Sequence, residues 1–333
     1  MTHQRLPASR RLRIVLLSTW VFALTAVNSW GQSPPITDLA FSPEGTSIVA
    51  CSQDGLQVFS WPALEKQRSI TVSFRNLHCL AFSNDGQRLA LGGGNPSENG
   101  GVEIFSWPQG KSLMSFLDHE DSVMEIAWSG DQKIVTAGRD RRLIKYDLEM
   151  EERVQTYEGH SRGINAVSLL PQGAMVTAGH DASVRVWDDD SGTLLKTLSQ
   201  HTQPVNAIAV CPAESALPMV ATAAKDRTVR FWQPTIGRLM RYVRLESEPL
   251  DIAWLNDSFL VASCVDGRLR CVDFENVQVV EIRPAIEGWA YAITVHPEDG
   301  SLAIAGSRGQ IRRSASRLLW TGGGYRLRPS RAA

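Results

Sequence analysis

Short apolar runs alternate with polar positions along most of the chain. In one such run, Val184 and Val186 alternate with Ser183 and Arg185, and turns rich in Gly, Asp, Asn and Pro separate the runs. A period of two residues is typical of β-strands with one buried face. A sustained helical period occurs only within residues 14–27. The pattern therefore predicts an all-β fold.

The predicted strands fall into units that recur along the chain. Motifs such as Leu39–Gly45 (LAFSPEG), Leu80–Gly86 (LAFSNDG) and Ile252–Asp257 (IAWLND) begin units, and a residue in a later strand of each unit provides a second marker. The second markers lie 46, 41, 41, 45, 40 and about 41 residues apart, at Phe59, Phe105, Tyr146, Trp187, Trp232, Val272 and Arg313. These intervals match the length of one propeller blade. Residues from Pro35 to about Ser314 are therefore predicted to form a seven-bladed β-propeller of four-stranded antiparallel blades.

Three adjacent units share a set of polar and aromatic residues at fixed offsets. A threonine precedes an aspartate by four residues, an aromatic residue follows that aspartate by six, and a histidine lies upstream. The three sets are His119, Thr136, Asp140 and Tyr146; His160, Thr177, Asp181 and Trp187; and His201, Thr222, Asp226 and Trp232. This combination resembles the WD40 repeat, because four residue types recur together rather than one dipeptide.

The resemblance implies that each set is a structural hydrogen-bond network. The aspartate, in the turn between the second and third strands, would accept a hydrogen bond from the histidine in the loop before the first strand. The threonine would bond the other ring nitrogen, and the indole would complete the chain. A catalytic triad is the alternative reading of these residue types, but an enzyme needs one site rather than three copies. Buried polar groups need partners in any case, so we predict no catalytic residues.

The other four units lack the complete set. Residues such as Ala50, Phe105 and Val272 occupy its positions there, so we expect those blades to depend on apolar packing. In blade 3, Tyr146 replaces the tryptophan, which keeps a donor but changes its reach. The second unit also contains Gly92–Gly101 (GGGNPSENGG), whose composition predicts a flexible connecting loop.

Candidate partner-binding residues flank the turn aspartates on one face of the predicted ring. Arg139, His180 and Lys225 precede those aspartates, while Arg141 and Arg227 follow them. Together they predict a cationic arc over blades 3 to 5.

A second candidate is aromatic. By resemblance to WD40 proteins, the residue that begins the first strand often contacts a partner. In the last blade this residue is Trp289, with Tyr291 nearby. Tryptophan and tyrosine dominate interface hot spots. The alternative is that Trp289 packs between blades 6 and 7.

The first 31 residues differ from the rest and predict export. Four arginines without an acidic residue precede Ile14–Val27, an apolar run of 14 residues, which is shorter than the roughly 20 needed to span a membrane. Small residues at Ser29 and Gly31 predict cleavage before Gln32. We therefore expect a signal peptide at 1–31 and a mature periplasmic or extracellular chain of bacterial type without a transmembrane span. An uncleaved N-terminal anchor is the alternative, and Ser9–Arg11 partly matches a twin-arginine signal.

Charge separates the predicted propeller, 32–315, from the C-terminal segment, 316–333. Without residues 1–31, 30 Lys and Arg face 35 Asp and Glu, a net charge of −5 that disfavours nucleic acid as a partner. Seven arginines and no acid follow from Arg308 onward, which leaves −12 on residues 32–307. Within the C-terminal segment, Arg317–Trp320 (RLLW) is predicted to form the outer strand of the last blade. The Arg-rich tail beyond it would contact an anionic surface, fold back on the propeller or remain solvated.

These features favour a non-enzymatic, exported scaffold that binds one or more protein partners, with no cofactor or metal. Neither a CxxC pair nor Cys/His zinc spacing occurs among the five cysteines. The alternative is a propeller enzyme or ligand sensor that uses the central channel with a metal or small-molecule cofactor. That function needs polar residues facing inward, whereas we expect the inner positions to be apolar, as at Leu39, Leu80, Ile126 and Ile252.

Overall fold

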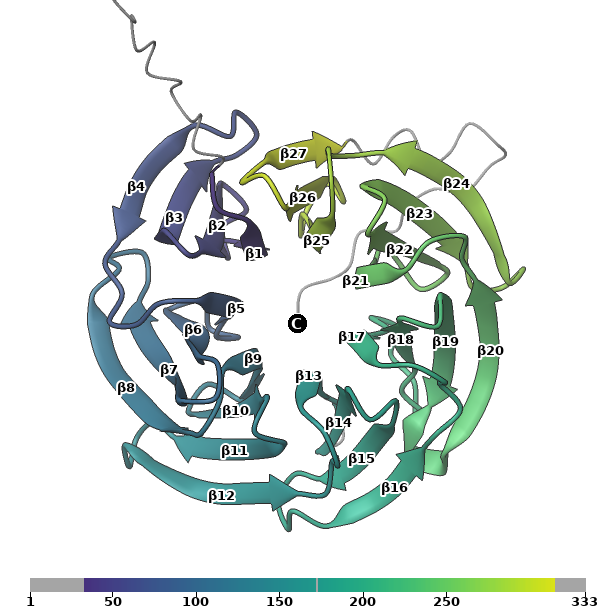
Figure 1. The fold of residues 1–333 in the computed structure, drawn as a ribbon, viewed down its shortest axis with the longest axis horizontal. Coiled ribbons are helices and arrows are strands. Elements are labelled where there is room, and N and C mark those ends of the chain that lie inside the picture. Colours follow the sequence, from purple (N-terminus) through teal and green to yellow (C-terminus); the bar gives the residue numbers. More distant parts are fainter. Residues whose placement is uncertain (1–32, 172, 315–333) are drawn as a thin grey trace, which may run out of the picture. The chain divides into compact units, whose positions relative to one another are not determined.

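The computed structural model describes residues 33–171 and 173–314. These residues form strands β1 to β27 and one 3₁₀-helix, η1 (Pro234–Ile236). Consecutive strands pair antiparallel into seven sheets, which are arranged as blades around a common axis (Figure 1). The predicted seven-bladed propeller of four-stranded blades is thus confirmed. Among the described residues, blade 7 contributes three strands.

The strands follow chain order from the axis outward in every blade. Blade 1 contains β1 (Ile36–Phe41), β2 (Ser47–Ser52), β3 (Gly55–Ser60) and β4 (Lys66–Ile70). Blade 2 contains β5 (Leu77–Phe82), β6 (Arg88–Asn95), β7 (Asn99–Ser106) and β8 (Ser112–His119). Blade 3 contains β9 (Val123–Ser129), β10 (Lys133–Gly138), β11 (Arg142–Asp147) and β12 (Glu152–Glu158). Blade 4 contains β13 (Ile164–Leu169), β14 (Ala174–Gly179), β15 (Val184–Asp188) and β16 (Leu194–Leu198).

The remaining blades repeat this order. Blade 5 contains β17 (Val205–Val210), β18 (Val220–Ala224), β19 (Thr228–Gln233) and β20 (Arg238–Arg244). Blade 6 contains β21 (Pro249–Trp254), β22 (Phe259–Cys264), β23 (Arg268–Asp273) and β24 (Gln278–Pro284). Blade 7 contains β25 (Ala290–Val295), β26 (Leu302–Gly306) and β27 (Ile311–Ser314).

Every innermost strand has a β-bulge close to its first residue. In β1 the register shifts between Ile36 and Asp38, and in β21 it shifts between Pro249 and Asp251. The other five innermost strands shift at the matching place. A bulge bends the strand and interrupts the strict alternation of its side chains. The face to which each side chain points after the bulge therefore cannot be predicted from a simple period of two.

The core of the propeller lies between the blades. Seven hydrophobic clusters are found among the described residues, and each joins two neighbouring blades. Between blades 3 and 4, for example, Tyr157 packs edge-to-face on Trp187 with ring centroids 6.1 Å apart. Burying one large apolar side chain contributes roughly 1.5–3 kcal/mol. The short, apolar strands of each repeat are thus stabilised mainly by the next repeat.

His296 connects blade 7 to blade 1, where the ring closes. Its Nε2 donates to the backbone oxygen of Gly45 at 3.0 Å, and Nδ1 accepts from the backbone N–H groups of Glu298 and Asp299 at 3.2 Å. The ring also packs edge-to-face on Phe41, 4.9 Å between centroids. Gly45 is required at this contact, because an added Cβ would lie 2.8 Å from Nε2. In the described residues, blades 1 and 7 meet through this hydrogen bond and through side-chain packing.

The prediction of a flexible loop at Gly92–Gly101 is wrong. Most of the segment extends the β6–β7 hairpin, and all five of its glycines are buried. A Cβ on Gly92 would lie 2.5 Å from Cys79 Sγ, and one on Gly100 would lie 2.0 Å from the Asp121 oxygen. Close backbone approach, rather than flexibility, explains these glycines.

Three predictions fall on segments that the structure does not describe. They are the signal peptide at 1–31, the outer strand at Arg317–Trp320 and the Arg-rich tail.

Candidate functional site

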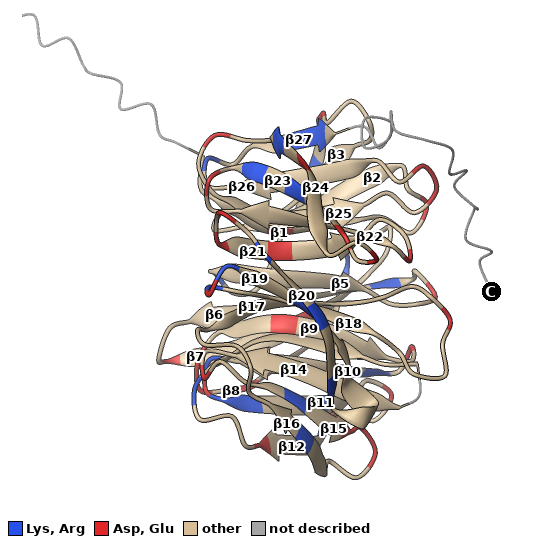
Figure 2. Cartoon of the chain, turned by 90° about the vertical axis from the view of Figure 1, so that its right-hand side faces the viewer, with Lys and Arg blue, Asp and Glu red and all other residues tan. Residues whose placement is uncertain are grey.

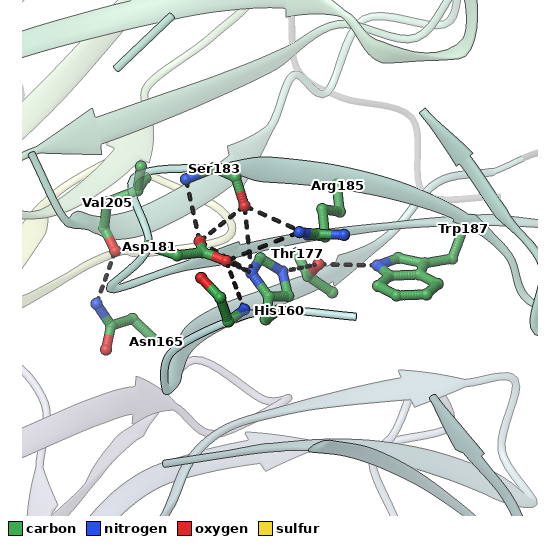
Figure 3. A network of polar contacts seen from close by, with 9 residues as sticks. His160, Asn165, Thr177, Asp181, Ser183, Arg185, Trp187 and Val205 are labelled. Atoms are coloured by element: carbon green, nitrogen blue, oxygen red, sulfur yellow. Dashed lines mark hydrogen bonds and ion pairs between the residues drawn. The ribbon is translucent and has the colours of Figure 1, made fainter. Parts of the chain in front are cut away.

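The network of blade 4 links strands β14 and β15 to the loop before β13 (Figure 3). His160 Nδ1 lies 3.0 Å from Asp181 Oδ2, and His160 Nε2 lies 2.8 Å from Thr177 Oγ1. The indole Nε1 of Trp187 donates to Thr177 Oγ1 at 2.9 Å. Ser183 Oγ also donates to Asp181, at 2.7 Å. The four residues of the set are thus in one hydrogen-bonded chain.

The direction of each hydrogen bond in this chain follows from the chemistry of its ends. The indole can only donate and an ionised carboxylate can only accept. The protons therefore run from Trp187 to Thr177, from Thr177 to His160, and from His160 Nδ1 to Asp181. Burial alone would raise the pKa of Asp181, but the hydrogen bonds from His160 and Ser183 outweigh it and lower that pKa. The histidine thus connects the carboxylate to the hydroxyl, with both ring nitrogens engaged in hydrogen bonds.

Blade 5 reproduces this geometry. His201 lies 2.9 Å from Asp226 and 2.8 Å from Thr222, and Trp232 Nε1 donates to Thr222 at 2.8 Å. Burial lowers the pKa of His201, which favours the neutral ring.

Blade 3 has the first part of the network and lacks the last contact. His119, the final residue of β8, lies 2.9 Å from Asp140 and 2.8 Å from Thr136. Tyr146 is fully buried, yet its hydroxyl has no hydrogen-bond partner among the described residues. Its ring instead stacks on Phe116 with centroids 4.4 Å apart. As expected from its different reach, the tyrosine hydroxyl does not take part in the hydrogen-bond network of blade 3.

Blade 6 has a polar pair that the sequence analysis missed. Arg270 is 2% exposed and donates to both carboxylate oxygens of Asp266, at 3.0 and 2.7 Å. These bonds lower the pKa of Asp266. The expectation that blade 6 depends on apolar packing alone is wrong, because arginine here replaces histidine as the partner of the turn aspartate. The repeated arginine four residues after that aspartate, also present at Arg185 and Arg230, was the available signal.

A repeated backbone hydrogen bond brings the two groups of candidate partner-binding positions together. The residue before the turn aspartate donates its N–H to the residue just before the first strand. The pairs in blades 3, 4 and 5 are Arg139 with Ser122, His180 with Gly163, and Lys225 with Pro204, at 2.8 to 2.9 Å. Blade 7 has the same bond from Ser307 to Trp289, at 3.0 Å. We call the surface formed by these turns and loops the network face.

On the network face, Arg139 and His180 join blades 3 and 4. Arg139 Nη1 lies 2.6 Å from His180 Nε2, so the arginine donates and the histidine accepts. Burial lowers the pKa of His180, and Arg139, Arg162 and Lys225 lower it further. Arg141, Lys225 and Arg227 are exposed. The sequence-predicted cations are thus on the network face, where Arg139 and Lys225 favour the neutral form of His180.

Trp289 lies on the surface rather than in an inter-blade core. Its side chain is 51% exposed and meets Tyr291 edge-to-face, with centroids 5.9 Å apart. The alternative that Trp289 packs between blades 6 and 7 is therefore wrong. An exposed tryptophan beside a half-buried tyrosine has the composition of a binding hot spot.

The innermost strands are more polar than expected. Leu39, Ile126 and Ile252 are buried against neighbouring blades, whereas the acids just before them, Asp38, Glu125 and Asp251, are partly exposed on those strands. Figure 2 shows the red acidic segment of β9 amid tan strands. The bulges account for the difference, because they change the alternation near these positions.

Two of these acids connect neighbouring blades. Asp38 accepts from the Leu80 N–H of blade 2 at 2.8 Å, and Asp251 accepts from the Ile293 N–H of blade 7 at 2.9 Å. Burial raises the pKa of Asp38 to about 7 and that of Asp251 to about 6. These carboxylates therefore act as inter-blade contacts that carry an electrostatic penalty at high pH.

Within residues 33–171 and 173–314, no group of three or more His, Cys, Asp or Glu side chains is arranged to hold a metal ion. The same part of the chain has no helix of the length and apolarity needed to cross a membrane. All five cysteines are buried thiols. Burial raises the pKa of Cys264 to about 11, so the reactive thiolate is disfavoured there.

Comparison with known proteins gives matches that fit this geometry. The model of the WD domain, G-beta repeat, matches residues 25–56, 110–147, 151–188 and 192–233. SEC12-like protein 2 of Arabidopsis thaliana is 40% identical over 57 residues, which are 17% of this chain and 14% of that protein. UBP9-binding protein bun62 of Schizosaccharomyces pombe is 28% identical over 123 residues, 35% of this chain and 22% of that protein.

A longer match is the guanine nucleotide-binding protein subunit beta of Zea mays, 26% identical over 158 residues, 42% of this chain and 40% of that protein. The matched parts span less than half the length of each of these relatives, all of which are eukaryotic. Three of the matched segments end one residue beyond the aromatic marker of a described blade. The chain thus contains WD40 repeats built into a seven-bladed β-propeller.

Proposed function

We propose that this protein is a non-enzymatic interaction scaffold that presents the network face to a protein partner. WD40 propellers are typical of such scaffolds. One relative, bun62, is named for binding UBP9, and another is named as a subunit of a guanine nucleotide-binding protein. The observation that carries the proposal is the exposure of Trp289 beside Tyr291, since a large aromatic side chain at a surface is characteristic of an interface.

The polar sets support the same proposal because their hydrogen-bonding groups are already occupied within the blade. In blades 4 and 5, both nitrogens of the histidine and the threonine oxygen are engaged in hydrogen bonds within the blade. A nucleophile or general base would need a free position toward a substrate. The repeated histidines are accordingly assigned to stability.

The test compares two exposed aromatic residues. Trp289→Ala removes the proposed anchor, and Tyr242→Ala removes a tyrosine that is 55% exposed on outer strand β20 of blade 5, where it packs on Arg230 rather than beside Trp289. We expect a stoichiometric partner that co-purifies with the parent to be lost from Trp289→Ala and retained by Tyr242→Ala. Both variants should melt within about 2 °C of the parent, because exposed side chains contribute little to stability.

Equal recovery of the partner by both variants would rule out the network face as the binding surface. A stoichiometric metal or small molecule in the purified parent would instead favour the alternative of an enzyme or ligand sensor.

We also propose that the protein is exported with loss of residues 1–31, on the strength of the arginine-rich start, the short apolar run and the small residues before Gln32. The bacterial type stays a prediction from this pattern, as does contact of the Arg-rich tail with an anionic surface. N-terminal sequencing of the native protein tests export. A chain recovered from the cytosol that still begins at Met1 would overturn it.

A further inference from the structure

Four exposed cations on the network face have no acidic partner in the described chain. They are Arg141, Arg162, Lys225 and Arg227, and none forms an ion pair with a residue that the structure describes. Their neighbour Arg142 differs, since it meets Glu120 at 2.9 Å. We call the four residues the free arc. They come from blades 3, 4 and 5, and Arg162 and Lys225 lie close enough to His180 to lower its pKa.

His180 reports the sign of the local electrostatic field. After burial, the largest influences on its pKa are Arg139, Arg162 and Lys225, all of which lower it. Asp181 is the acid that opposes them, and its carboxylate already accepts hydrogen bonds from His160 and Ser183. The surface around His180 is therefore locally positive, with the nearest counter-charge engaged beneath it.

Two members of the free arc occupy backbone positions that suit glycine. Arg141 has φ 74° and Arg227 has φ 63°. The matching residues of blades 1, 6 and 7 are Gly55, Gly267 and Gly309, with φ of 100°, 71° and 64°. A side chain in this left-handed region is strained, whereas glycine is not. Ala182 occupies the same position in blade 4, so this turn also accepts a side chain without a charge. Neither arginine gains an ion pair within the described chain, so its charge remains available to a partner.

We propose that the free arc binds an acidic segment of the protein partner, with several Asp or Glu side chains on consecutive or alternate positions. This inference rests on the proposed function and specifies the chemistry of the partner. The charge pattern favours a short segment over an extended polyanion. Residues 32–307 carry a net charge of −12, and Glu246 and Glu287 are exposed in the loops that precede blades 6 and 7. An RNA strand or a flat anionic membrane across this face would meet those acids, whereas a peptide can remain over blades 3 to 5.

The experiment measures binding of a labelled peptide of alternating Glu and Gly, with a Gln and Gly peptide as the uncharged control. Fluorescence anisotropy in about 50 mM salt keeps screening low. We expect the parent to bind the Glu peptide at least about tenfold more tightly than the Gln peptide. The double variant Arg141→Gly with Arg227→Gly should weaken this binding about fivefold or more, and Lys225→Gln should weaken it about two- to fivefold.

Ala182→Gly is the matched control. Ala182 occupies the same turn position in blade 4, with φ 62°, and the substitution changes no charge. We expect it to leave peptide affinity within about twofold. Because glycine relieves the left-handed strain while adding freedom to the unfolded chain, all three glycine substitutions should give melting temperatures equal to the parent or up to about 3 °C higher. Loss of binding without loss of stability would separate recognition from folding.

His180 provides an independent readout. In an NMR titration, the Glu peptide should raise the pKa of His180, because its carboxylates offset the field of the neighbouring cations. The Gln peptide should leave that pKa unchanged.

Equal affinity for the two peptides, or unchanged affinity in the double variant, would overturn the proposal. Tighter binding of single-stranded RNA or of phosphatidylserine vesicles, lost in the same variant, would also overturn it in favour of a different polyanion. If the acidic peptide fails while Trp289→Ala still loses the native partner, the proposed scaffold function stands and only the acidic recognition is wrong.

Discussion

The strongest test of the network asks whether the contributions of His160 and Asp181 to the free energy of unfolding depend on each other. The perturbation is a double-mutant cycle that consists of His160→Ala, Asp181→Ala and the combination. In the folded protein the two side chains share the contact of 3.0 Å between Nδ1 and Oδ2. Both lie in a site that is largely shielded from solvent, with side-chain exposures of 0% and 6%.

The magnitude follows from the partners that each substitution leaves behind. His160→Ala removes the partner that receives the Thr177 proton, while Asp181 keeps the N–H groups of Ser161 and Ser183 and the Ser183 hydroxyl. A buried polar group without its partner costs about 1–3 kcal/mol, and a hydrogen bond to a charged group contributes about 1.5–3 kcal/mol. We expect each single variant to lose roughly 1–3 kcal/mol of unfolding free energy. The double variant should lose less than the sum by about 1–2 kcal/mol.

The assay is urea unfolding followed by tryptophan fluorescence, in which Trp187 reports from within the network. Equal m-values among the variants would show that the surface exposed on unfolding is unchanged. The matched control combines His160→Ala with Asp226→Ala. Asp226 makes its corresponding contact with His201 in blade 5, so the losses of that pair should add within about 0.5 kcal/mol.

Additive losses for His160 and Asp181 would refute the network as described, since two groups that share a hydrogen bond cannot contribute independently. Strong coupling between His160 and Asp226 would also contradict this interpretation. It would show that non-additive losses arise between blades that share no network, and so are not evidence of a direct hydrogen bond.

Three further outcomes follow from contacts elsewhere in the ring. Because burial raises the pKa of Asp38 from 3.8 to about 7, the folded protein retains a proton that the unfolded chain releases. This contribution to stability is complete below pH 3.8 and is lost as pH rises through about 7. Asp38→Asn should therefore flatten the decline in unfolding free energy between about pH 4 and 7, by up to about 1.4 kcal/mol per pH unit. Arg270→Ala leaves Asp266 without its bidentate partner and should lower unfolding free energy by about 2–4 kcal/mol in urea melts, whereas a loss below 0.5 kcal/mol would mean that the pair is dispensable. His296→Ala removes the hydrogen bond to the Gly45 oxygen at the junction of blades 7 and 1, and should speed amide exchange in β1 and β25 more than in β13. Uniform exchange across the three strands would contradict a local role there.

The periodic features of this protein were predictable from its sequence. Alternation over a few residues identifies a strand. The recurrence of LAFSPEG-like motifs indicates the number of blades, because every blade buries similar residues at similar positions. The resemblance of each set to the WD40 repeat also anticipated the contacts of His160 with Thr177 and Asp181.

Features that depend on neighbouring blades were not predictable in this way. Tyr146 carries a hydroxyl in the expected position, but whether it reaches Thr136 depends on side-chain geometry in a packed core, where the ring stacks on Phe116. The Gly92–Gly101 segment has the composition of a loop, yet contacts with Cys79 and Asp121 hold it in a hairpin. The composition of a segment indicates which backbone conformations it can adopt, but not which neighbouring residues will hold it in one of them.

The same distinction applies to the surface. The sequence by itself placed Arg141 and Arg227 beside turn aspartates, and Trp289 before an inner strand, since each is a position within one repeat. Only the tertiary structure decided that both arginines lack an acidic partner in the described chain, and that Trp289 is exposed. Repeats are specified by interactions over a few residues, whereas the exposure and pairing of a side chain depend on residues far away in the chain that the closed ring brings next to it.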